Sequence, residues 1–539
     1  LTAPNGVAGT FLLDPQTYTI IDGDNMPTTV GDFITVGDQY FNTLTGTTLV
    51  ISSTGDVIFD LGIDGNNPTN DGVMSFLNLS GNRVNLTINS GTDPDPDGII
   101  DFGDDGITVS GLNSMNLNSE GGVLFGDSRV VVNGNVNIDS VGAIQLQTGT
   151  LLVTNDGDIT LDGENGVDLG SGFINPGAGG GSTGFLHILS DRDIDLGTSS
   201  ITVNANNEIN PLSITAGDPL DLLAIPADLI LGGAQISVVQ TGGASGVQGL
   251  ILTATRDIDF GSSDLTYSHN RSSSGTYEDR ISAGGNIFSS AAPDGDPGNF
   301  LNNYVITGDT GPLLMTAGGS IVLTDLFLDV NEVDGNIFRD TTIAANGGVL
   351  DLGNSEIDIE TALTLSSSSD IIFNSPTLTT RNNGDLDIQA GGNVTLNNGT
   401  LNSQGFLHIS GDGDVSLGSS SLIVDAGAGE INPLSITAGD PLNIMAPPAD
   451  LLLGDAQMLI NAVGSASDVQ GLVLTATGDI DFGSSDLTFS QDRSTSGTYQ
   501  DRIIAGGDIF TSAAPDGDPG NFLNNYVITG DTGPLLMTA

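Results

Sequence analysis

Five carboxylates in one short segment have the spacing of a calcium loop. The segment reads Asp93-Pro94-Asp95-Pro96-Asp97-Gly98-Ile99-Ile100-Asp101-Phe102-Gly103-Asp104, with acids at positions 1, 3, 5, 9 and 12. Carboxylates at alternate positions converge on one ion, and Gly98 permits the sharp bend. No helical pattern flanks the segment, so the sequence predicts a stand-alone calcium site at Asp93, Asp95, Asp97, Asp101 and Asp104. The alternative is an ordinary acidic turn. No pattern requires a cofactor.

A second group of residues is suited to contact with a partner. The polar segment 267–304 returns as a near-copy at 489–526. Arginine and aromatic residues anchor interfaces, and excursions from a rigid scaffold often carry function. The sequence predicts contact residues in both copies: Arg271, Tyr277, Arg280, Phe300, Tyr304, Arg493, Tyr499, Arg502, Phe522 and Tyr526. The alternative is that each excursion packs on its own scaffold, with Asp279 and Arg280 paired locally.

Signatures of catalysis are few. His187 and His408 stand inside strand patterns, which indicates structural placement, and His269 is replaced by Gln491 in the copy. The chain has no Cys, no Trp and no Lys. A β-helical polysaccharide hydrolase would need a marked pair of carboxylates, and none stands out among the many acids. We expect no enzyme, with a polysaccharide-active enzyme as the less favoured alternative.

The composition restricts the partners. The 539 residues carry a net charge of −57 and 77 glycines. Such a charge repels nucleic acid and anionic lipid. No apolar run reaches about 18 residues, so no membrane span is predicted. The chain opens at Leu1 without Met, and we expect it to be processed or a segment of a longer protein.

The elements that must position these residues are short β-strands. In the segment 384–396, Leu386 and Ile388 alternate with Asp385 and Asp387, and a Gly pair precedes Val394-Thr395-Leu396. Period two indicates half-buried strands, and the glycines mark corners. Units recur about every 22 residues, which is typical of a solenoid with two or three strands per rung. The sequence predicts an all-β, right-handed parallel β-helix with loop excursions.

A longer repeat lies over the short one. Residues 184–317 match residues 405–539 with an offset of 221 and then 222, and the segment 290–317 is identical to 512–539. We predict an N-terminal β-helix region with acidic loops at 1–183, a repeat block at 184–317, connecting rungs at 318–404 and a second block at 405–539. Because the second block stops where the first continues, we expect the array to go on.

The Gly-Asp-Ile-x-φ-Gly-Ser units (φ apolar) and the opening Gly9-Thr10-Phe11-Leu12-Leu13-Asp14-Pro15 resemble filamentous haemagglutinin-type exoproteins of bacteria. The resemblance implies a secreted adhesin with a β-helical shaft, exported by two-partner secretion. Ala3-Pro4-Asn5-Gly6 stands in place of the usual Asn-Pro-Asn-Gly motif, so the secretion domain lies upstream or the route differs.

From this resemblance we expect an extracellular or cell-surface location. The expected roles are attachment or biofilm matrix, and the expected partners are a host or neighbouring cell surface, extracellular polysaccharide or other copies of the chain. The alternative function is a self-assembling extracellular filament subunit.

Overall fold

The computed structural model describes residues 17–21, 28–30, 33–37, 48–60, 73–75, 83–91, 98–103, 107–147, 150–155, 157–178, 184–206, 210–221, 224–241, 248–270, 278–292, 300–308, 312–331, 340–427, 433–443, 445–463, 471–492, 501–512, 526–530 and 535–539. Every regular element in these ranges is a β-strand. The chain divides into two compact units, Leu1–Tyr277 and Glu278–Ala539, called unit 1 and unit 2. The boundary falls inside the first repeat block.

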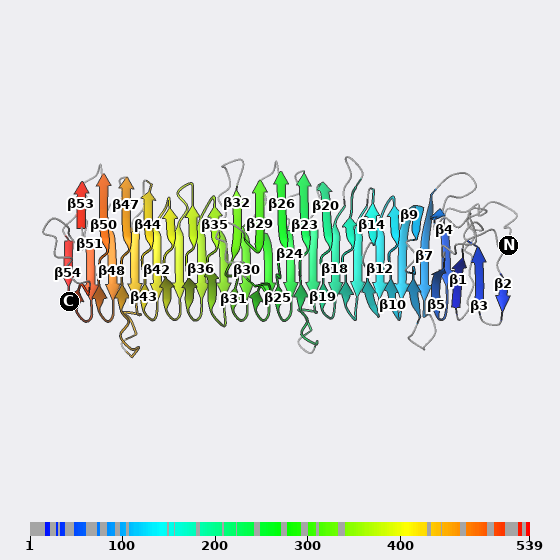
Figure 1. Ribbon diagram of the computed structural model, residues 1–539, viewed down its shortest axis with the longest axis horizontal. Coiled ribbons are helices and arrows are strands. Elements are labelled where there is room, and N and C mark those ends of the chain that lie inside the picture. Colours follow the sequence, from blue (N-terminus) through cyan, green and yellow to red (C-terminus); the bar gives the residue numbers. More distant parts are fainter. Residues whose placement is uncertain are drawn as a thin grey trace. The chain divides into compact units, whose positions relative to one another are not determined.

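In each unit, most strands pair in parallel with the third strand further along the chain, and these pairs build three sheets (Figure 1). The antiparallel pair β2–β3 in unit 1 is the exception among the described pairings. In unit 1, sheet 1 holds β1 (Thr17–Ile21), β2 (Thr28–Val30), β3 (Phe33–Gly37), β5 (Asp56–Asp60), β8 (Ile99–Asp101), β10 (Gly122–Leu124), β13 (Ala143–Gln145), β16 (Val167–Asp168), β19 (Ile194–Asp195), β22 (Leu229–Ile230) and β25 (Ile258–Asp259). Sheet 2 holds β4 (Thr48–Ser52), β7 (Val84–Ser90), the second half of β9 (Thr108–Ser119), β12 (Val136–Ser140), β15 (Ile159–Gly163), β18 (Leu186–Ser190), β21 (Leu212–Ala216) and β24 (Gln248–Ala254). Sheet 3 holds β6 (Val73–Ser75), the first half of β9, β11 (Arg129–Val132), β14 (Leu151–Thr154), β17 (Phe173–Asn175), β20 (Ser200–Asn206), β23 (Gln235–Thr241) and β26 (Asp264–Asn270).

Unit 2 is built from the same kind of three-strand rung. Its sheet 1 holds β28 (Ile287–Phe288), β31 (Ile321–Val322), β34 (Leu350–Gly353), β37 (Ile371–Phe373), β40 (Val394–Leu396), β43 (Val415–Ser416), β46 (Leu451–Leu452), β49 (Ile480–Asp481) and β52 (Ile509–Phe510). Its sheet 2 holds β27 (Glu278–Ala283), β30 (Leu313–Ala317), β33 (Thr341–Ala345), β36 (Leu363–Ser367), β39 (Leu386–Ala390), β42 (Leu407–Gly411), β45 (Leu434–Ala438), β48 (Leu472–Ala476), β51 (Asp501–Ala505) and β54 (Leu535–Thr538). Its sheet 3 holds β29 (Asn302–Gly308), β32 (Leu326–Asn331), β35 (Glu356–Ile359), β38 (Thr377–Thr380), β41 (Thr400–Ser403), β44 (Ser421–Ala426), β47 (Gln457–Val463), β50 (Asp486–Asp492) and β53 (Tyr526–Gly530).

These strands confirm the predicted parallel β-helix. The rung β36–β37–β38 stacks on β39–β40–β41, and all three pairs are parallel and in register. Leu363 pairs with Leu386, 23 residues further on, close to the expected interval. We expect the coil to be right-handed, because crossovers between parallel strands almost always are.

The alternating pattern decides which face each side chain takes. One interior column of unit 2 contains a leucine on each of four successive rungs, and each is 0% exposed: Leu363, Leu386, Leu407 and Leu434. In unit 1 the rings of Phe59, Phe102 and Phe125 stack in the same way, with centroids 4.5 and 4.9 Å apart. Burying one such side chain contributes about 1.5–3 kcal/mol, so these interior columns are the main stabilising feature of each unit.

Candidate functional site

Four members of the predicted calcium site, Asp93, Asp95, Asp97 and Asp104, lie outside the described residues. Asp101 ends β8, and its Oδ1 accepts a hydrogen bond from the backbone N–H of Gly103 at 2.8 Å. Within the described ranges no group of three or more His, Asp or Glu is placed to hold a metal ion. Calcium binding at this loop therefore stays a prediction, and the observed bond of Asp101 serves the corner of the rung.

The bond at Asp101 recurs because the motif Asp-φ-Gly recurs. At each site the aspartate carboxylate accepts the N–H of the glycine two residues later, and that glycine has a positive φ, which L-residues with a side chain seldom adopt. Besides Asp101 and Gly103, the pairs are Asp168 and Gly170, Asp195 and Gly197, Asp259 and Gly261, Asp351 and Gly353, and Asp481 and Gly483. These six aspartates thus close corners of the rungs.

A second set of acids joins one rung to the next. In unit 2, at the corner before sheet 1, each side-chain Oδ1 accepts the backbone N–H of the corresponding residue on the following rung. We call this set the acidic row: the acceptors Asp370, Asn393, Asp414, Asp450 and Asp479, and Asp508, whose N–H donates the last bond, with bonds of 2.7 to 2.8 Å. Unit 1 has the same bonds from Asp228 to Asp193 and from Asp257 to Asp228, and Arg256 forms an ion pair with Asp228. Asn393 shows that the acceptor oxygen, not the charge, is the shared requirement.

The structure describes only some of the predicted contact residues. Five of them lie outside the described residues: Arg271, Tyr277, Arg493, Tyr499 and Phe522.

Tyr304 lies in β29 with 1% of its surface exposed, so its side chain belongs to the core and not to a contact surface. Tyr526 begins β53, and only its backbone is described. Phe300 is half-buried, with its ring 5.3 Å from that of Phe327. Arg502 is half-exposed in β51.

Arg280 has a different partner from the one expected in the local-packing alternative. It lies in β27, and its Nε donates to Oε1 of Glu278 at 2.9 Å, while Asp279 is 1% exposed. Strand alternation separates them, because Asp279 points inward and Arg280 points outward. Moreover, β27 pairs with β30 and β28 pairs with β31. The described part of the 267–304 segment within unit 2 therefore includes rung strands as well as a connection between them.

The two strand histidines occupy equivalent places in the two repeat blocks. His187 lies in β18, stacks on Phe185 with ring centroids 4.1 Å apart, and donates from Nε2 to the carbonyl oxygen of Asn210 at 3.0 Å. Oδ1 of Asp158 accepts the N–H of Phe185 at 3.2 Å. Burial lowers the pKa of His187 from its ordinary 6.5 and raises the pKa of Asp158.

In the second block, His408 stacks on Phe406 at 4.0 Å, and Asp385 accepts the N–H of Phe406 at 3.0 Å. Burial raises the pKa of Asp385, with an opposing contribution from that backbone bond. The ring of His187, bonded to the carbonyl oxygen of Asn210, can orient its strand.

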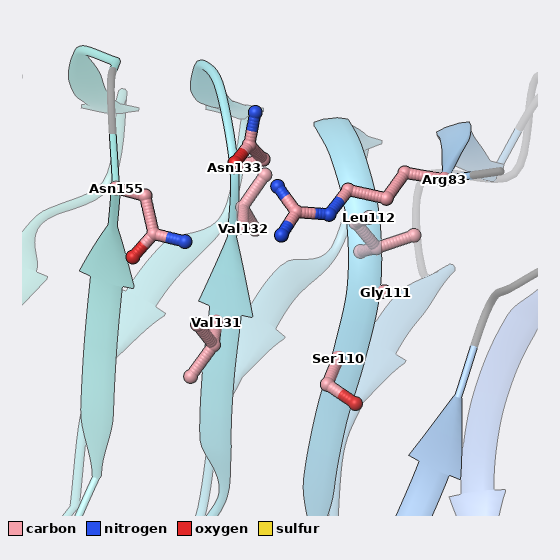
Figure 2. A pocket seen from close by; sticks show the side chains of 8 residues that line it. All are labelled: Arg83, Ser110, Gly111, Leu112, Val131, Val132, Asn133 and Asn155. Atoms are coloured by element: carbon pink, nitrogen blue, oxygen red, sulfur yellow. The ribbon is translucent and has the colours of Figure 1, made fainter. Parts of the chain in front are cut away.

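A hollow of about 260 Å³ opens on the surface of unit 1, and sequence reasoning did not find it. Figure 2 shows the Arg83 side chain extending across it toward Asn133. Its lining includes the partly exposed Val131, whereas Leu112 and Val132 are 1% and 0% exposed and contribute almost no surface to it. The cause is a bulge in β9, where the register against β11 shifts between Val130 and Val132. The signal in the sequence is Gly111, with a φ of 77°, an isolated glycine inside a strand pattern.

Comparison of the chain with protein-family models, with curated proteins and with solved structures finds no match. Within the described ranges, no helix is long and apolar enough to cross a membrane. The structure thus places the chain in a fold class, the three-sheet parallel β-helix, and the likeness to haemagglutinin-type exoproteins rests on the sequence motifs alone.

Proposed function

We propose that the protein is a secreted fibrous structural protein that supports bacterial attachment to cells or to a biofilm matrix. The observation that carries this proposal is the use of polar side chains. The acidic row and the Asp-φ-Gly corners direct carboxylates at the protein's own backbone, rung after rung. Such an arrangement favours a uniform scaffold, because the repeated polar groups maintain the stack instead of converging on a substrate.

The haemagglutinin-type resemblance supports the finer parts of the proposal. These are an extracellular or cell-surface location, export by two-partner secretion, and contact with a cell surface or an extracellular polysaccharide. Loops at the corners are the natural contact elements, since surface loops tolerate change while the rungs keep their register. Calcium at the Asp93 loop would stiffen one such corner. No catalytic role is proposed.

The test is display of the chain on a non-adherent bacterium, followed by measurement of cell retention on epithelial cells and on polysaccharide-coated surfaces. The matched control carries Leu386→Asp, which places a charge in the interior column and disrupts rungs without altering the surface. Retention that exceeds this control supports the proposal. Equal retention by both chains, or release of reducing sugars from the coated polysaccharide, contradicts it.

Electron microscopy of the purified chain separates the two non-enzymatic functions. Particles of one fixed length support a scaffold that acts as a single molecule. Filaments of indefinite length with an axial repeat would instead support a self-assembling subunit.

A further inference from the structure

The hollow of unit 1 has a polar lining with one positive charge. Arg83 stands exposed at its side, and the partly exposed Ser110, Asn133 and Asn155 contribute a hydroxyl group and two amides. None of the eight lining residues is acidic. In a chain with ten basic residues and 67 acids, an anionic group that enters this hollow meets an arginine and no lining carboxylate.

The polar groups of the lining are not used within the fold. Among the described residues, no hydrogen bond or ion pair involves the side chain of Arg83, Asn133 or Asn155. Elsewhere in unit 1, outward asparagines on adjacent rungs bond each other, as Asn113 does to Asn85 at 2.8 Å. Asn133 and Asn155 follow the paired strands β11 and β14, yet they form no such bond. Their donors and acceptors are therefore available to a ligand.

These groups converge on one space. Figure 2 shows the Arg83 side chain extending toward Asn133, with Asn155 on the other side of Asn133. Adjacent rungs are about 4.8 Å apart, so the guanidinium and the two amides can reach neighbouring groups of one small ligand. The guanidinium fork binds a carboxylate through two parallel hydrogen bonds. Each amide offers an acceptor and donors, which suits adjacent hydroxyl groups of a sugar ring.

We propose that the hollow binds a sugar residue that carries one carboxylate, with the carboxylate on Arg83 and the ring hydroxyls on Asn133 and Asn155. The hollow of about 260 Å³ has the size of a single sugar residue and not of a polysaccharide chain. The residue stands at the end of an otherwise neutral glycan, because the net charge of −57 opposes the approach of a polyanion. This inference rests on the proposed attachment role, for which it names the ligand.

Other occupants fit the hollow less well. An apolar side chain would find little surface to contact, because Leu112 and Val132 are 1% and 0% exposed. A bare inorganic anion would use Arg83 alone and would make no use of the two amides. A sugar uses all three groups, and the partly exposed Val131 can contact the C–H face of its ring.

Binding is measured on the purified full chain by saturation-transfer difference NMR at low salt. The acidic probes are a methyl sialoside and a methyl glucuronide, and the neutral control is a methyl glucoside. We expect a Kd of about 1 mM for at least one acidic probe, and binding of the glucoside that is weaker by about ten-fold or more. No binding of either acidic probe, or equal binding of the glucoside, would overturn the proposal. Sodium sulfate that binds as tightly as the acidic sugars would also overturn it.

Two exposed arginines of unit 1 provide a matched pair of variants. Arg83→Gln should weaken binding of the acidic probe by about ten-fold or more, because it removes the guanidinium fork. Arg129→Gln removes the same charge from β11, outside the lining of the hollow, and should leave the Kd within about two-fold. Asn133→Ala should weaken binding by about two- to ten-fold through loss of the amide. Circular dichroism checks that each variant is folded. Equal losses in the two arginine variants would indicate general attraction to positive charge and refute the hollow as the site.

The position of the acidic residue in a glycan is tested with two larger probes at low salt. An oligosaccharide with one terminal sialic acid should bind through Arg83 with the affinity of the methyl sialoside. Polygalacturonate should bind about ten-fold more weakly per residue, because its charges and those of the chain repel each other. Tighter binding of the polymer would overturn the assignment to a glycan end.

Failure of this inference is distinguishable from failure of the attachment role. Bacteria that display the Arg83→Gln chain should lose retention on sialylated epithelial cells if the hollow is the contact. Retention equal to that of the native chain, and above that of the Leu386→Asp control, would refute the hollow and keep the attachment role.

Discussion

Oδ1 of Asp450 accepts the backbone N–H of Asp479 at 2.8 Å, one rung further along the stack. Asp450 in turn donates its own N–H to Asp414 at 2.8 Å. The carboxylates of the acidic row are therefore neighbours of like charge, each held in place by a bond that needs only an acceptor oxygen.

Replacement of Asp450 by Asn and by Ala should separate these two contributions. Asp450→Asn keeps an acceptor and removes like-charge repulsion, so the denaturation midpoint at low salt should stay equal or rise. Asp450→Ala removes the acceptor and should cost about 1 kcal/mol. Urea denaturation at low salt and at about 0.5 M NaCl measures both, and the gain of the Asn variant should shrink with salt. A lower midpoint for Asp450→Asn than for Asp450→Ala would contradict this account.

Two adjacent glycines provide a matched test of the corners. Gly232 has a φ of 61°, and a Cβ there would lie 2.4 Å from the carbonyl oxygen of Gly197. Gly233 would meet only side-chain atoms of Ser262 and Thr198, at 3.5 Å. Gly232→Ala should therefore destabilise unit 1 by about 2–4 kcal/mol, whereas Gly233→Ala should change stability by less than about 1 kcal/mol. Equal thermal shifts in the two variants would refute the role of the close approach.

The lowered pKa of His187 predicts a loss of stability in acid. Because burial favours the neutral ring in the folded state, the contribution of His187 is fully present above about pH 6.5 and is lost as the pH falls through 6.5 toward the folded pKa. His187→Gln can still donate to the carbonyl of Asn210 but does not titrate. Between about pH 7 and pH 5, the melting temperature of the wild type should fall more than that of this variant. A difference that is independent of pH would contradict the assignment.

Asp162 should behave in the opposite sense. Partial desolvation, with added repulsion from Asp139 and Asp191, raises the pKa of Asp162 above the ordinary 3.8. A raised carboxyl pKa gives stability that is present below about pH 3.8 and is lost as the pH rises through the folded pKa. Asp162→Asn should therefore raise the melting temperature at pH 7 and have little effect at pH 3. Asp412→Asn removes one charge from another exposed aspartate and is the control. An equal rise there would show a general effect of net charge and contradict the account.

Calcium should raise the melting temperature of the wild type if the Asp93 loop binds it. Asp95→Asn should abolish that rise, because two carboxylates at alternate positions would no longer converge with a third. Asp486→Asn, distant in the sequence and placed in β50, is the control. A melt that is unchanged by calcium or by chelator identifies the loop as an acidic turn.

The fold could be predicted because its determinants are local. Leu386 and Ile388 point inward simply by alternation, and the Asp-φ-Gly corners repeat at a spacing that is visible in the sequence. The polar composition of the segment 278–288 suggested part of a contact excursion. In the structure β27 is a rung strand, with Asp279 inside and Arg280 outside. The hollow could not be predicted, because Gly111 alone does not reveal which neighbour is displaced by the bulge. Leu220, which follows β21, is 90% exposed. This exposure could not be predicted either, since the sequence does not show whether an apolar residue at a corner turns toward the stack.

The corner glycines have a further consequence for inheritance. A Cβ at Gly197 would meet the carbonyl of Gly170, one at Gly232 that of Gly197, and one at Gly261 that of Gly232, all within 2.4 Å. Each glycine is thus constrained by the backbone of its counterpart in the rung before. A gene rearrangement that adds or deletes whole rungs preserves these pairings, while one that shifts a corner by a single residue breaks them. Recombination between repeats can therefore change the number of rungs freely, and the length of the array becomes a trait that varies without any new packing solution.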